Sequence, residues 1–94
     1  MKNRENTINN YLKYCITQKR LDEKTIKAYR IDLTQFSNKT NNIALEQINV
    51  DILEDYISFL NNCYKPKTVK RKLASIKAFF HYLEYKDIII FNPF

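Results

Sequence analysis

The most informative segment of the chain is PKTVKRKLASIKAFFHYL, residues 66–83. It opens with Pro66, and proline is common at the first position of a helix because its missing N–H is not needed there. The apolar residues then recur at alternating spacings of four and three, which is the pattern of one helix face: Val69, Leu73, Ile76, Phe80 and Leu83. The segment therefore predicts a helix that begins at Pro66 and packs one side into a core.

Three further helices are predicted from the rest of the chain. The first covers about residues 7–19, the second runs from an N-cap at Asp22 to about Phe36, and the third follows a cap at Asn49. A polar loop is expected at 37–47. No stretch alternates with the period of a strand, and the chain has no glycine for tight hairpin turns, which leaves Asn as the substitute. The 94 residues thus predict one all-α domain, a compact four-helix bundle.

The C-terminus is unusual for the end of a domain. Residues 88–94 read IIIFNPF, an apolar run without helical periodicity. Because isolated domains rarely expose such a patch, we expect residues 1–87 to form the domain and residues 88–94 to begin a linker to a second domain.

The composition excludes several classes of protein. The longest apolar run, residues 88–91, is too short to span a membrane, and the polar residues 1–10 do not form a signal peptide. Two cysteines and the single histidine, His81, are too few for a structural zinc site, so no metal and no cofactor is expected. We expect Cys15 and Cys63 to be buried free thiols in a reducing compartment, with a disulfide as the alternative, and we place the protein in the cytoplasm.

The charge is concentrated in one part of the chain. Residues 1–63 hold nine basic and eight acidic side chains, whereas residues 64–86 hold seven basic side chains and one acid, Glu84. A concentrated basic region on a chain of net charge +6 indicates a polyanionic partner, either nucleic acid or an anionic membrane surface.

On a helical wheel the predicted fourth helix turns its cations away from its apolar side. Two small residues, Ala74 and Ala78, lie among the long basic side chains Lys67, Lys70, Arg71 and Lys77. This surface suits a helix in a DNA major groove, while the alternative is an ordinary solvated face. A solvated face usually carries mixed charges, and no acid occurs between Asp55 and Glu84, which favours DNA.

The predicted second helix repeats the pattern more weakly. Lys24, Lys27 and Arg30 share one side, but Ile31 interrupts it. We expect Ile31 to pack on a neighbouring helix rather than to touch a thymine methyl group. Catalysis is not expected of this chain, because neither His81 nor any tyrosine has an activating cluster nearby in sequence.

Two motifs resemble those of tyrosine recombinases. Residues 24–33, KTIKAYRIDL, followed by Phe36, are similar to the family's K-T-x-x-x-Y-x-x-D-L-x-x-F helix, and residues 66–83 are similar to its P-x-T-x-x-R-x-L helix. The closing Asn92-Pro93 is similar to the family's exit into the catalytic domain. The resemblance implies a core-binding, SAM-like N-terminal domain of a phage-integrase or Xer-type recombinase, which closes with the catalytic domain around duplex DNA.

The resemblance also implies a set of DNA contacts. They are Lys67, Thr68, Lys70 and Arg71 in the fourth helix and Thr25, Lys27 and Ala28 in the second, with Lys24 and Lys77 on phosphates. Two positions depart from the family pattern: Lys65 stands where a capping Ser is common, and Ala28 offers no hydrogen bond. No residue of this chain inherits a catalytic role, since those residues belong to the absent domain.

The expected function is DNA binding within a site-specific recombinase or integrase. Its expected partners are double-stranded DNA, its own catalytic domain and other recombinase protomers, and no membrane. The fragment alone is not expected to be an enzyme, whereas the full-length protein would be a strand transferase. The alternatives are a helical protein-interaction module that docks through residues 88–94, and a basic helix on an anionic membrane, which the alanines of its basic face disfavour.

Overall fold

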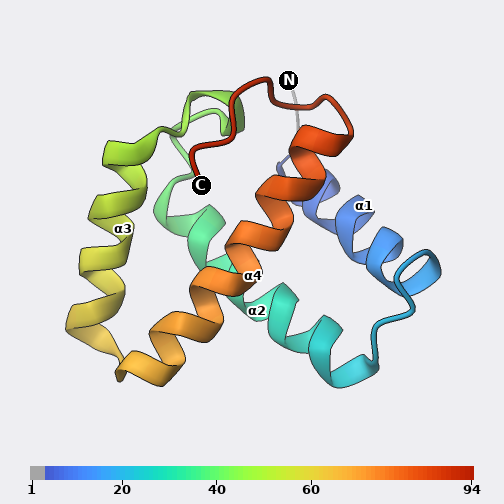
Figure 1. Cartoon of the computed structure of the whole chain (residues 1–94), viewed down its shortest axis with the longest axis horizontal. Helices are drawn as coiled ribbons and strands as arrows, with labels where there is room; N and C mark the ends of the chain where they lie inside the picture. Colours follow the sequence, from blue (N-terminus) through green and yellow to red (C-terminus); the bar gives the residue numbers. More distant parts are fainter. Residues whose placement is uncertain (1–3) are drawn as a thin grey trace.

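A computed structural model describes residues 4–94 (Figure 1). Its helices are α1 (Arg4–Thr17), α2 (Glu23–Lys39), the 3-10 turn η1 (Leu45–Gln47), α3 (Val50–Cys63) and α4 (Pro66–Tyr85). The described residues contain no strand, which confirms the predicted all-α fold. The predicted domain began at residue 1, and residues 1–3 lie outside the described part of the chain.

The predicted starts of α2, α3 and α4 are confirmed, whereas the first helix covers Arg4–Thr17 and not residues 7–19. The Asp22 carboxylate accepts a hydrogen bond from the Thr25 N–H at 2.8 Å, and the Asn49 side chain accepts one from the Ile52 N–H at 2.9 Å. Pro66 occupies the start of α4, and Lys65 before it makes no side-chain cap. These contacts satisfy backbone N–H groups that a helix start otherwise leaves without partners.

The predicted loop at 37–47 is wrong at both ends. Helix α2 continues to Lys39, and η1 covers residues 45–47. The extra turn of α2 is closed by Thr40, whose N–H and hydroxyl both donate to the Phe36 carbonyl, at 3.1 and 2.9 Å. The polar residues 37–39 can therefore continue α2, because the Thr40 side chain that follows them donates to a carbonyl of the last turn.

Two helices end in left-handed residues, and neither residue is the expected asparagine. Arg20 has φ 56° and Asp87 has φ 58°. After α4, the Asp87 N–H donates to the Glu84 carbonyl at 3.1 Å and the Ile88 N–H donates to the Leu83 carbonyl at 2.8 Å, which is a Schellman motif. A left-handed residue reverses the chain here without glycine.

The core lies where α4 crosses α2, with α1 and α3 on opposite sides of the crossing (Figure 1). Phe36 of α2 is buried and meets Tyr56 and Phe80 edge-on, at centroid distances of 5.0 and 5.9 Å. Such edge-to-face pairs are a favoured aromatic geometry. Of the five apolar residues that predicted α4, Leu73 is partly buried and the others are buried.

The C-terminal segment is partly packed and partly exposed. Ile89 is buried and the Phe94 ring lies 5.5 Å from that of Phe80, whereas Ile90 is 97% exposed. Both cysteines are free as predicted, but only Cys15 is buried, because Cys63 ends α3 at the surface. Within residues 4–94 no helix is both long and apolar enough to cross a membrane.

Candidate nucleic-acid interface

An ion-paired carboxylate joins the two crossing helices. Asp32 of α2 is fully buried, and its Oδ2 atom accepts hydrogen bonds from Arg71 Nη1 and Ser75 Oγ, both at 2.7 Å. Its Oδ1 atom accepts a third from Lys72 Nζ at 3.1 Å. A buried charge is tolerated only when it is paired and hydrogen-bonded, so Asp32 fixes how α4 sits on α2.

This network places Lys72 inside the protein, whereas the sequence shows it only as one of the seven basic residues of the segment 64–86. The side chain of Lys72 is 6% exposed, while that of Arg71 is 49% exposed. The available signal was Asp32 itself, an acid directly beside Leu33 in the apolar stripe that contains Tyr29 and Phe36.

The start of α4 carries exposed positive charge. Lys67, Lys70 and Arg71 are exposed, Thr68 is partly buried, and the first turn contains no acid. These cations add to the positive end of the helix dipole. Between described residues, the only acid in an ion pair is Asp32, so Lys67 and Lys70 are unpaired.

The start of α2 carries the second predicted group. Lys24 and Lys27 are exposed, while Thr25 and Ala28 are partly buried. The Thr25 N–H serves the helix cap by donating to the Asp22 carboxylate, and hydrogen bonding to Thr25 lowers the pKa of Asp22. In Figure 1 the N-terminal halves of α2 and α4 form the two lower arms of the crossing, with the start of α2 at the lower right and the start of α4 at the lower left.

Two expectations for α2 are changed by the structure. Ile31 is 58% exposed, so the expected packing on a neighbouring helix is wrong. Its position beside Asp32 turns it outward because Asp32 occupies the inward position at the crossing. Arg30 donates to the Asn9 side chain of α1 at 3.0 Å, which ties it to α1.

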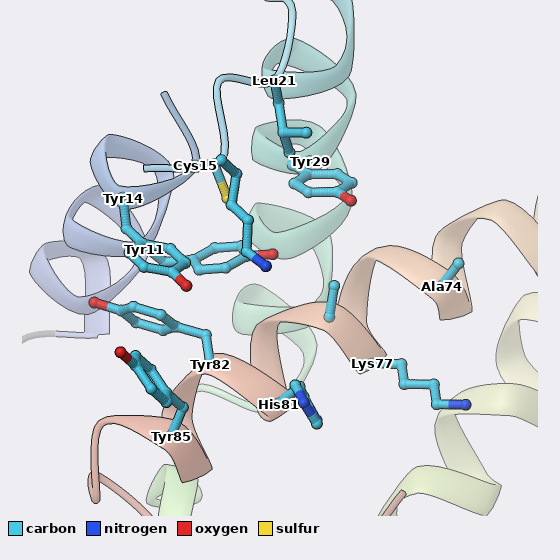
Figure 2. Close-up of a pocket in the computed structure, with 12 residues that line it drawn as sticks. Tyr11, Tyr14, Cys15, Leu21, Tyr29, Ala74, Lys77, His81, Tyr82 and Tyr85 are labelled. Carbon is cyan, nitrogen blue, oxygen red and sulfur yellow. The ribbon is translucent and has the colours of Figure 1, made fainter. Parts of the chain in front are cut away.

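Lys77 lies apart from the cations that begin α4. It sits at the edge of a groove between α1, α2 and α4, near Ala74 and Ala78 (Figure 2). The groove has a volume of about 740 Å³ and is lined by five tyrosines, Tyr11, Tyr14, Tyr29, Tyr82 and Tyr85. The groove could not be predicted from the sequence, because its tyrosines come from three helices.

The chemistry of the groove does not favour nucleophilic catalysis. Burial and a hydrogen bond to Cys15 raise the pKa of Tyr11, and burial raises the pKa of Cys15. Both groups therefore stay protonated at neutral pH, whereas a nucleophile needs activation. His81 is exposed at the edge, and the described residues hold no group of three possible metal ligands.

Comparisons with known proteins agree with the resemblance seen in the sequence. The family model described as "Phage integrase, N-terminal SAM-like domain" matches residues 8–86. The chain is 60% identical over 94 residues to a tyrosine recombinase of Agathobacter rectalis, covering all of this chain and 31% of that protein. It is also 36% identical over 87 residues to tyrosine recombinase XerC of Herpetosiphon aurantiacus, covering 88% of this chain and 28% of that protein.

A third relative, tyrosine recombinase XerC of Staphylococcus epidermidis, is 32% identical over 80 residues, which is 82% of this chain and 27% of the relative. The chain therefore spans less than a third of the length of these curated relatives. No solved structure matches it.

Proposed function

The chain belongs to the phage integrase N-terminal SAM-like domain family, and from this membership we propose that it binds duplex DNA for a site-specific tyrosine recombinase. A role in DNA recombination follows from the family. The contact surface is the proposal: the N-terminal halves of α2 and α4 face the major groove at the core site and hold the duplex on one side.

The observation that carries this proposal is the unpaired charge at the start of α4. A cation near a helix N-terminus opposes the dipole and costs about 0.3–1 kcal/mol. Lys67 and Lys70 make no ion pair with any described residue that would offset this cost. A phosphate group would be attracted both by these cations and by the positive end of the helix dipole. DNA binding therefore explains why unpaired cations stand at the start of α4, although they do not stabilise the helix.

The same surface offers few groups for reading bases. Arg71 is held by Asp32 through Nη1 and leaves the rest of its guanidinium on the exposed side. Ala28 can make only apolar contacts, and the exposed Ile31 offers an apolar side chain for contact with a thymine methyl group. We therefore expect Lys24, Lys27, Lys67, Lys70 and Lys77 to contact phosphates and Thr25, Thr68 and Arg71 to lie near base edges.

The proposal extends to the whole protein. A catalytic domain would follow residues 88–94, supply the nucleophile and complete the clamp around DNA, and other protomers would assemble on paired sites in the cytoplasm. The exposed Ile90 and Phe91 would then meet that domain. The same exposure is what favours the alternative, a helical module that docks on a partner protein through this segment.

Duplex binding by a Lys67→Ala, Lys70→Ala double variant tests the interface. We expect its affinity to fall about 10-fold, because two phosphate contacts are lost. The matched control is Lys13→Ala, Lys86→Ala, which removes the same charge from exposed positions outside the interface and keeps most of the affinity. Arg71 is left intact because its removal would also disturb Asp32. Equal loss in both double variants would refute the interface and leave only nonspecific attraction.

A further inference from the structure

The groove beside the proposed duplex-binding face has the size of a ligand site. Its volume of about 740 Å³ lies within the roughly 300–1,000 Å³ that is typical of ligand pockets. Helices α1, α2 and α4 all contribute to its walls. Their packing holds most of the lining side chains in place, and the connection between α1 and α2 adds Lys19 and Leu21.

Aromatic rings form most of the groove surface. Tyr11 and Tyr82 are buried, while Tyr14 and Tyr29 are partly buried and Tyr85 is 69% exposed. The Tyr29 ring lies nearly parallel to that of Tyr11, at 12° and 6.2 Å between centroids, and the Tyr85 ring lies 6.4 Å from that of Tyr14. Figure 2 shows these rings gathered on one side of the groove, so a flat aromatic ligand would find rings to stack on.

The charged groups of the groove are all basic. Lys19, Lys77 and His81 line it, and no lining residue in the described chain is acidic. Lys77 points away from the tyrosine rings in Figure 2, which places its charge outside the aromatic part. The groove therefore fits a ligand with a flat aromatic end and an anionic end, which is the chemistry of a nucleotide.

We propose that this groove binds a single unpaired nucleotide of the DNA, with its base against the tyrosines and its phosphate near the basic edge. This rests on the proposed duplex-binding function, because Ala74 and Lys77 belong both to the groove and to the outward face of α4. A paired base is held in its stack and cannot enter, whereas an unpaired base leaves the stack at little cost. The groove would then hold a base wherever the duplex opens.

Binding to two duplexes of equal length tests the groove, one fully paired and one with a single unpaired 2-aminopurine. A base stacked on an aromatic side chain is worth about 1–3 kcal/mol, so we expect the unpaired duplex to bind about 10-fold more tightly. The 2-aminopurine fluorescence should fall on binding, because stacking quenches it. Tyr85→Leu with Lys19→Gln removes an exposed ring and a cation, and we expect it to abolish the preference while leaving the affinity for the paired duplex unchanged.

A matched control removes the same groups elsewhere. Phe91→Leu with Lys13→Gln takes away an exposed ring and an exposed cation that do not line the groove, and it should keep the preference. Tyr29→Leu removes the ring that α2 contributes and should also reduce the preference, with circular dichroism to monitor the fold. A preference that persists in both groove variants, or a wild type that binds the paired duplex without any preference, would overturn the groove site alone. A wild type that binds neither duplex would overturn the duplex-binding function as well.

Discussion

Arg71 Nη1 lies 2.7 Å from Asp32 Oδ2, and this contact joins the helix that carries most of the basic surface to the helix beneath it. The carboxylate is fully buried, whereas the Arg71 side chain is 49% exposed. One nitrogen of the guanidinium therefore binds Asp32 at the helix crossing, while the rest of the group is exposed. The geometry links the stability of the crossing to the position of a proposed DNA contact.

Removing the buried carboxylate should be costly. Asp32→Ala leaves Lys72 buried without its partner, and such uncompensated charges typically cost about 3–5 kcal/mol. We expect the free energy of unfolding, measured by urea denaturation, to fall by that amount. Asp55→Ala, which removes an exposed acid of α3, should change it by less than about 0.5 kcal/mol. Equal effects of the two substitutions would show that the buried network of Asp32 contributes nothing to the free energy of unfolding.

Tyr56→Phe should stabilise the protein. The Tyr56 hydroxyl is buried and finds no hydrogen-bond partner among the described residues. An unsatisfied buried hydroxyl costs about 1–3 kcal/mol, so its removal should raise Tm by several degrees in a domain of this size. Tyr11→Phe is the control, because the Tyr11 hydroxyl is not among the buried groups without a partner and a hydrogen bond with Cys15 contributes to its raised pKa, so its removal should not raise Tm. A lower Tm for Tyr56→Phe would contradict the structure at this position.

Arg20→Gly should also raise Tm. Arg20 has φ 56°, a conformation that costs a residue with a Cβ atom about 1–2 kcal/mol and costs glycine little. The greater freedom of glycine in the unfolded chain offsets part of this gain, which leaves roughly 0.5–1 kcal/mol. Lys13→Gly within α1 is the control and should destabilise by about 1 kcal/mol. Destabilisation by both would mean that Arg20 is not left-handed.

Stability should decline at alkaline pH. Burial raises the pKa of Cys15, Tyr11 and Tyr56, so each keeps its proton in the folded state at a pH where the unfolded chain has lost it. Their contribution is fully present below the unfolded pKa, about 8.5 for Cys and 10 for Tyr, and is lost as the pH rises through the folded value. The urea midpoint should therefore fall steadily above about pH 8.5.

The control for this prediction is Cys15→Ala. It removes the group that titrates first in the unfolded chain, so the decline between about pH 8.5 and 10 should be smaller than in the wild type. A midpoint that stays constant to pH 10 in the wild type would show that Cys15 is not buried in solution.

The helices could be predicted because their signals are local. The caps at Asp22 and Asn49 and the proline at 66 act within a few residues, and all three are confirmed. The Asp32 network could not be predicted in the same way, because its partners lie 39 to 43 positions away in another helix. Position along α4 places Lys72 on the apolar side between Val69 and Ile76 and Lys70 on the outward side, but it does not identify Asp32 as the partner of Lys72.

For the candidate interface, the sequence predicted which cations of α4 are exposed. The wheel identified the outward cations of α4, and the exposure of Lys67, Lys70, Arg71 and Lys77 agrees with it. It could not show that Arg71 is tied to Asp32 or that Lys77 borders a groove. Both properties depend on how α2 and α1 pack against α4.

The salt dependence of duplex binding tests the central claim most directly. The logarithm of the binding constant should fall linearly with the logarithm of salt concentration, with a slope of about −0.9 for each phosphate neutralised. Lys67→Ala with Lys70→Ala should make that slope less negative by up to about 1.8, and Lys13→Ala with Lys86→Ala should leave it nearly unchanged. Equal slopes for the wild type and the Lys67, Lys70 variant would contradict the claim that the start of α4 lies on the DNA backbone.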